Sequence, residues 1–121
     1  TLTVEQGQAF KTIIEKHFQD NSPFLKSGYT ISDLYKETGI PTYQLSAFIN
    51  QEYAKNFNEF INEYRVVHLD NLTRQSSEYR QYTLEALGRM AGFRSRTAFI
   101  AAVKKKTNKT PSEFFGKLGE Q

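Results

Sequence analysis

The stretch TLEALGRMAGFRSRTAFIAAVKKKTNKTPSEFF, residues 83–115, decides the fold. It contains the signals of a capped helix, a turn at Gly92, a second helix and the capped start of a third. The closing segment Thr110-Pro111-Ser112-Glu113 supplies an N-cap, a proline at the first helical position and a glutamate at the third. A short helix, a glycine turn and a second helix form the layout of a helix-turn-helix motif.

The same signals occur earlier, in TISDLYKETGIPTYQLSAFINQEYAKNFNEF, residues 30–60. Gly39 matches Gly92 at an offset of 53 residues, and after the turn Leu45 matches Phe99 at an offset of 54. One copy therefore has a single extra residue in its turn. Because such internal similarity is typical of a repeated structural unit, the sequence predicts two helix-turn-helix motifs in an all-helical chain.

Helix signals also lie outside the two copies. Thr3 and Gln6 have the spacing of a capping box, and Gly39 is expected to end the first helix of its motif in the left-handed conformation. A long helix is predicted after Asn56, with Glu59 completing another capping box. The side chains available for one broad apolar face of this long helix are Phe60, Ile61, Tyr64, Val67 and Leu72.

The composition bounds the classes of function. The chain has 121 residues, of which 38% are apolar, and it contains no Cys. Disulfide scaffolds, Cys-ligated zinc and thiol catalysis are thereby excluded. The longest apolar run, Phe99–Val103, is far shorter than the ~20 residues that span a bilayer. No signal peptide is expected. We expect a cytoplasmic protein without membrane contact by this fragment, and an effector or sensor domain before Thr1.

The positive charge is concentrated in the last third of the chain. Residues 1–40 and residues 41–82 each carry 4 basic and 5 acidic side chains, whereas residues 83–121 carry 8 basic and 3 acidic ones, a net +5. This segment is expected to attract a polyanion most strongly. A solvated basic tail is the alternative interpretation of the charge alone.

Helical spacing selects the side chains that would read DNA. In each second helix of a motif, one face is apolar and the other presents residues that can contact bases or phosphates. In the first motif these outward residues are Thr42, Tyr43, Gln44, Ser46, Ala47 and Asn50. In the second motif they are Arg94, Ser95, Arg96, Thr97, Ile100, Ala101, Lys104 and Lys105, opposite a buried face of Phe99, Ala102 and Val103.

The order of residues across positions 24–115 resembles the AraC-type (AraC/XylS) family of bacterial transcription regulators. The pattern is carried by Thr30-Ile31-Ser32-Asp33-Leu34, Gly39-Ile40-Pro41 and Phe60-Ile61-Asn62-Glu63-Tyr64-Arg65 in the first half, and by Met90-Ala91-Gly92-Phe93 with Thr110-Pro111-Ser112-Glu113-Phe114-Phe115 in the second. Pro23-Phe24-Leu25 is similar to members from Bacteroides-type bacteria.

The resemblance implies a C-terminal DNA-binding domain that binds double-stranded operator DNA, with RNA polymerase as a candidate further partner. It implies about seven helices in two three-helix, homeodomain-like subdomains. The boundaries are residues 1–55 for the N-terminal helix and first motif, 56–73 for a linker helix, and 74–121 for the second motif. The two recognition helices are expected to enter successive major grooves.

Several residues depart from the family pattern. Tyr35 and Gly88 stand where a small Ala usually packs between the motif helices. Ala54 and Asn108 stand where a Gly usually ends each recognition helix. Ile100-Ala101 replace residues that are usually polar, so the base contacts of the second motif are expected to differ.

Other functions are weighed against DNA binding. An enzyme is not expected, because the chain lacks a His near a paired Ser or carboxylate, a phosphate loop and clustered acids. No cofactor, metal or catalytic residue is expected, and Arg65 is interpreted as structural. The alternative function is a helical protein–protein interaction module with a degenerate helix-turn-helix, using an apolar patch of Tyr43, Ala47, Ile100 and Ala101. The three lysines from Lys104 could instead be a solvated helix end.

Overall fold

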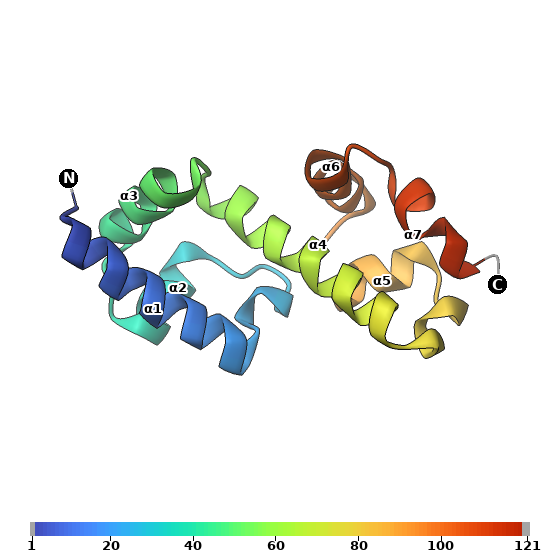
Figure 1. Ribbon diagram of the computed structural model, residues 1–121, viewed down its shortest axis with the longest axis horizontal. Helices are drawn as coiled ribbons and strands as arrows, with labels where there is room; N and C mark the ends of the chain where they lie inside the picture. Colours follow the sequence, from blue (N-terminus) through green and yellow to red (C-terminus); the bar gives the residue numbers. More distant parts are fainter. Residues whose placement is uncertain (1, 120–121) are drawn as a thin grey trace. The chain divides into compact units, whose positions relative to one another are not determined.

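A computed structural model of the chain describes residues 2–119 (Figure 1). Over that range the chain is all-helical, with seven α-helices, two short 3-10 helices and no strand, which confirms the predicted fold class. The elements in chain order are α1 (Val4–Asn21), η1 (Pro23–Leu25), α2 (Ile31–Thr38), α3 (Thr42–Tyr53), α4 (Phe57–Gln75), η2 (Ser77–Gln81), α5 (Leu84–Met90), α6 (Arg96–Thr107) and α7 (Pro111–Gly119).

The chain folds as two compact units. The first unit comprises the residues up to Pro23 together with Tyr29–Phe60, and the second comprises Phe24–Gly28 together with the residues from Ile61 onward. The first unit therefore contains the motif α2–α3, and the second contains the motif α5–α6. Helix α4 begins in the first unit and continues in the second.

The capping boxes predicted from the sequence are present. At the start of α1, the backbone N–H of Gln6 donates to Thr3 Oγ1 over 3.1 Å, and the Thr3 N–H donates to Gln6 Oε1 over 3.0 Å. Such reciprocal bonds satisfy backbone donors that the first helical turn leaves without a partner. The same pair of bonds joins Thr30 to Asp33, Asn56 to Glu59 and Thr110 to Glu113.

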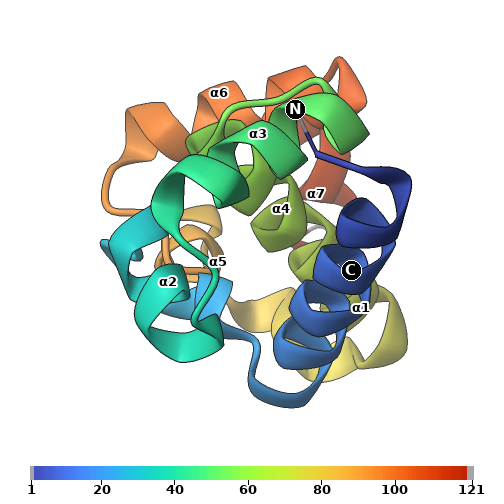
Figure 2. The same ribbon diagram turned by 90° about the vertical axis from the view of Figure 1, so that its left-hand side faces the viewer.

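The core of the first unit is built from aromatic and branched aliphatic side chains. Helices α1, α2 and α3 pack against one another, and the start of α4 joins them through Phe60 (Figures 1 and 2). The Phe48 ring meets Phe10 edge to face, and the Tyr53 ring packs on Phe60 with centroids 4.9 Å apart. Aromatic pairs of this kind add to the stabilisation from burial. The buried apolar residues are Ile14, Phe18, Tyr29, Leu34, Ile40, Leu45, Phe48, Ile49 and Phe60.

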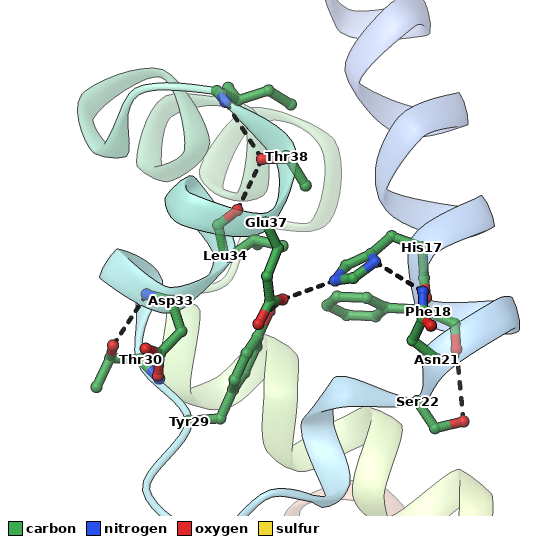
Figure 3. Close-up of polar contacts among 11 residues, drawn as sticks. His17, Phe18, Asn21, Ser22, Tyr29, Thr30, Asp33, Leu34, Glu37 and Thr38 are labelled. Atoms are coloured by element: carbon green, nitrogen blue, oxygen red, sulfur yellow. Dashed lines mark hydrogen bonds and ion pairs between the residues drawn. The ribbon is translucent and has the colours of Figure 1, made fainter.

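A polar network joins α1 to α2 within this unit (Figure 3). The Glu37 carboxylate accepts a hydrogen bond from the Tyr29 hydroxyl over 2.6 Å, and the same Glu37 oxygen lies 2.6 Å from His17 Nε2. Asn21 contacts the other ring nitrogen of His17 at 3.1 Å. Burial of the Tyr29 ring and the bond to Glu37 both raise the pKa of its hydroxyl, so Tyr29 stays protonated. His17 thereby has a structural role.

The second unit has its own core beneath the α5–α6 motif. The Phe99 ring lies against Phe93 and Phe115, with centroids 5.2 and 6.3 Å away. The buried cluster comprises Val66, Leu69, Leu87, Ala91, Phe93, Phe99, Val103 and Phe115.

The inner face of α4 agrees with the predicted one only in part, since Phe60 and Ile61 are buried while Tyr64 and Leu72 are half-buried. Ile61, Arg65, Leu69 and Thr73 are buried, and these positions repeat every four residues along one side of the helix. Val67, predicted to be on the apolar face, is 37% exposed. The reason is geometric, since two residues after Arg65 the side chain points about 200° away around the helix.

Candidate nucleic-acid interface

Helix α3 presents a polar and aromatic face to solvent. Leu45, Phe48 and Ile49 are buried against the first unit's core. On the other side, Tyr43 is 73% exposed, and Thr42, Ser46 and Asn50 are exposed as well. Gln44 and Ala47 are half-buried on its flanks. The six candidate residues of the first motif thus occupy the part of α3 that is turned away from the core.

The charge of α3 is low. The helix contains no Lys or Arg, and its acidic residue Glu52 forms an ion pair of 3.3 Å with Lys11 of α1. An exposed pair of this kind contributes little to stability. For the interface it matters more that α3 has no cationic side chain that could contact a polyanion.

Helix α6 has an apolar inner face and a basic outer one. Phe99 and Val103 are buried, while all eight candidate residues of the second motif are exposed. Ala102, predicted to be buried with them, is half-buried because it lies at the edge of the face. The Ser95 hydroxyl caps the helix by accepting the Ala98 N–H over 3.1 Å.

The turn between α5 and α6 brings the two helices very close together. Gly92 adopts φ +96, and hydrogen bonds run from its N–H to Arg89 O and from Phe93 N–H to Gly88 O, each 3.0 Å long. This is the Schellman arrangement that ends helices at a left-handed residue. A Cβ at Gly88 would lie 2.9 Å from the Phe99 ring, so the missing side chain lets α6 approach α5 more closely than an Ala would.

Tyr35, at the equivalent position of the first motif, behaves differently. Its side chain is 45% exposed, so it does not fill the space between α2 and α3. Leu34 beside it is fully buried and supplies the packing of α2 instead. The bulky replacement is therefore accommodated at the surface.

The cations around α6 differ in their contacts. Lys104 Nζ donates to Asn108 O over 3.0 Å at the helix end, and Lys106 Nζ lies 3.6 Å from Glu63 of α4. Arg94 and Arg96 form neither a hydrogen bond nor an ion pair within residues 2–119. Their guanidinium groups are thus available for an external acceptor such as a phosphate or a guanine.

A groove of about 470 Å³ lies beside the start of α6. It includes Arg94, Ser95, Arg96 and Ile100 from the candidate set. The other lining residues come from α5, the turn before α6, α6 itself and the start of α7, among them Leu84, Phe93 and Pro111. The second motif therefore combines cations with a recessed apolar surface.

The structure also brings a residue to this site that the sequence analysis did not single out. Gly28 lies in the second unit, and a Cβ placed on it would be 3.6 Å from Arg94 Nη1. The signal in the sequence is the turn Lys26-Ser27-Gly28, but local turn chemistry does not tell which distant side chain it meets.

His68 is in a structural position. The His68 ring packs edge to face on Phe24, and its burial lowers its pKa, which favours the neutral imidazole.

Among residues 2–119, no group of His, Cys, Asp and Glu side chains is arranged to hold a metal ion. In that same range, no helix combines the length and apolar character needed to cross a membrane.

Comparisons with known proteins agree with this architecture. The sequence model of a family described as "Helix-turn-helix domain" (HTH_18) matches residues 34–117. A solved structure of a protein of unknown function from Listeria innocua is similar, with a TM-score of 0.69 and 19% identity over 88% of this chain and 95% of that one. At this identity the likeness shows the fold alone. No curated protein matches the chain.

Proposed function

We propose that α6 is the principal DNA-recognition helix of this chain, which belongs to the AraC-type helix-turn-helix family (HTH_18). Members of this family are non-enzymatic domains that bind DNA in transcription regulation. The observation that carries this proposal is the exposure of all eight candidate residues of the second motif, among them two arginines that form no hydrogen bond or ion pair within residues 2–119. Arginine can contact guanine O6 and N7 with two hydrogen bonds, and lysine neutralises phosphates.

The two motifs are proposed to contribute differently to DNA binding, one mainly to affinity and the other mainly to selectivity. The second motif supplies most of the affinity, because residues 83–121 carry the net +5 charge. The first motif adds selectivity through Tyr43, Gln44, Ser46 and Asn50, since amide and hydroxyl groups can read base edges without adding charge. Thr42 and Ala47 complete the contact surface of α3, as Ile100 and Ala101 do for α6 next to a thymine methyl group.

The wider setting of the domain is also a proposal. An operator or promoter is its DNA target, RNA polymerase is a candidate partner, and an effector or sensor domain precedes Thr1 in the full protein. We place the protein in the cytoplasm, where its DNA target lies. The family match begins after Pro23-Phe24-Leu25, so the Bacteroides-like origin remains a hypothesis.

Selection from random DNA tests the proposal directly. The purified chain is used to enrich duplexes from a random pool, and binding of the enriched and scrambled sequences is compared by fluorescence anisotropy over a range of salt concentrations. Enriched duplexes should bind on the order of 10³-fold more tightly than scrambled ones, and both affinities should fall steeply with salt. Without enrichment or salt dependence, the exposed Tyr43 and Ile100 would instead be contacts for a protein partner.

A further inference from the structure

A short segment from outside both motifs belongs to the second unit. Residues Phe24–Gly28 precede α2 in sequence, yet they pack with the residues from Ile61 onward. We call this segment the strap. Phe24 is buried, with its ring packed on Tyr64 at a centroid distance of 5.3 Å, and Leu25 packs against the core cluster of the second unit.

The strap is held by the buried guanidinium of Arg65. Arg65 Nε donates to Phe24 O over 2.7 Å, Nη2 donates to Lys26 O over 3.1 Å, and Nη1 donates to Asn62 Oδ1 over 3.0 Å. The same guanidinium lies 5.4 Å from the centre of the Phe93 ring. One cation therefore fixes both the strap backbone and the residue that precedes Arg94.

The strap backbone lies directly against the turn of the second motif. A Cβ at Gly92 would be 2.7 Å from Leu25 O and 3.0 Å from Phe24 O. Real Cβ atoms do not approach a backbone oxygen this closely, so only glycine allows the contact. The strap and the turn that orients α6 thus form one packed layer.

The end of the strap meets Arg94. Gly28 has φ +75, and its Cβ position is 3.6 Å from Arg94 Nη1 and 3.9 Å from Cζ. These are ordinary van der Waals distances, so a side chain at position 28 would lie beside the guanidinium, and Gly28 leaves that space without one. A side chain with an acceptor at this position would reach the guanidinium.

We propose that the strap, by packing against the turn at Gly92, sets the direction in which Arg94 leaves that turn toward DNA, and that Gly28 keeps the space beside the Arg94 guanidinium free of a competing side chain. This inference rests on the proposed role of Arg94 in the DNA contact. It assigns part of the DNA selectivity to a segment about seventy residues before α6 in sequence, outside both helix-turn-helix motifs.

Two substitutions at one position test the proposal. Asn and Asp both tolerate the left-handed conformation better than other side chains, so Gly28→Asn and Gly28→Asp have similar backbone costs. Only the aspartate can form an ion pair with Arg94 and withdraw it from DNA. Gly28→Asp should weaken binding to the selected duplex at least about fivefold relative to Gly28→Asn, the low end of what one arginine contact contributes.

A double-mutant cycle separates this effect from a general loss of charge or of fold. In an Arg94→Ala background, the difference between Gly28→Asp and Gly28→Asn should vanish. The Arg94 Nε–H resonance of the free protein should move further in Gly28→Asp than in Gly28→Asn, because a bond to a carboxylate is stronger than a bond to a neutral amide. Thermal unfolding verifies that the two variants are equally folded.

The outcomes distinguish this inference from the function on which it rests. If Arg94→Ala alone leaves the affinity unchanged, the proposed role of Arg94 in DNA binding is wrong, and the inference is overturned with it. If Arg94→Ala weakens binding but the Gly28→Asp and Gly28→Asn variants bind alike, the strap does not position Arg94. A difference that persists without Arg94 would also overturn the inference, because it would reflect only repulsion between the introduced carboxylate and DNA.

Discussion

Ala54 and Asn108 end their recognition helices in the same way. Ala54 has φ 55 and Asn108 has φ 61, and each donates its backbone N–H to the carbonyl four residues earlier, over 2.9 and 2.8 Å. The two positions are related by the offset of 54 residues that the sequence repeat predicts. Their side chains differ in how well they tolerate this left-handed conformation, because Asn enters it at a lower cost than Ala.

Replacing Ala54 by glycine should therefore stabilise the first unit. Relief of the left-handed strain contributes about 1–2 kcal/mol, and the greater freedom of glycine in the unfolded chain offsets about 0.4–1 kcal/mol of it. We expect Ala54→Gly to raise the free energy of unfolding by roughly 0.5–1 kcal/mol in urea titrations followed by circular dichroism. Asn108→Gly is the matched control and should change it much less. Equal effects at the two positions would contradict this account of the strain.

Charge reversal on α6 should change the salt dependence of DNA binding. Lys104→Glu with Lys105→Glu is expected to weaken binding to all sequences alike and to reduce the salt slope by about one unit per lost phosphate contact. Lys106→Glu is the comparison variant, because this lysine lies at the same helix end and its Nζ is 3.6 Å from Glu63 of α4. An unaltered slope in the double variant would mean that Lys104 and Lys105 do not face DNA.

Arg96 should contribute to selectivity rather than to general affinity. It occupies the first turn of α6 and has no hydrogen bond or ion pair within residues 2–119. Arg96→Ala is expected to cost about 1–3 kcal/mol on the selected duplex and to relax the preference at one base pair. Arg74→Ala removes the same charge from α4, where Arg74 pairs with Asp70, and serves as the control. A loss that is equal for every sequence would make Arg96 a phosphate contact.

Local chemistry made much of the fold predictable from the sequence. The capping boxes at Thr3, Thr30, Asn56 and Thr110 depend on residues three apart, and all four are present. The positive φ of Gly39 likewise follows from its place at a helix end. The exposed faces of α3 and α6 agree with helical spacing, because a hydrophobic stripe fixes which side is buried. The contacts of those faces with DNA remain predictions.

The strap could not be predicted by the same reasoning. Its packing depends on Arg65 reaching the carbonyls of Phe24 and Lys26, about forty residues earlier in the chain. Neither capping rules nor periodicity contain information on such separations. The burial of Arg65 and the exposure of Val67 could not be predicted for a related reason. Hydrophobicity alone assigns the apolar Val67 to the core and the charged Arg65 to the surface. The burial of Arg65 is favourable because its guanidinium donates three hydrogen bonds and lies against the Phe93 ring.

The bond between Tyr29 and Glu37 should make stability sensitive to alkaline pH. Because burial and this bond raise the pKa of Tyr29, the folded protein keeps the proton, whereas unfolded tyrosine loses it near pH 10. The stabilisation from Tyr29 is therefore complete below about pH 10 and decreases above it. Tyr29→Phe should be less stable than the unmodified protein at pH 8, and the difference should shrink by up to about 1.4 kcal/mol per pH unit above pH 10. Tyr35→Phe, at an exposed position, is the control. A difference that stays constant from about pH 8 to pH 11 would contradict the prediction.

A single chain should protect two short DNA segments, because it carries two different recognition helices. Successive major grooves on one face of a duplex are about 34 Å apart, so the protected segments should lie about ten base pairs apart, centre to centre, without a dimer. The site should be asymmetric, since Tyr43, Ser46 and Asn50 differ from the residues on α6. Footprinting should show protection under α6 at a lower protein concentration, because the positive charge lies there.

Inserting about five base pairs turns one segment half a turn away, and joint protection should then be lost. If the insertion has no effect, only one motif reads DNA, and α3, which has no Lys or Arg, would be reassigned to packing or to a protein contact.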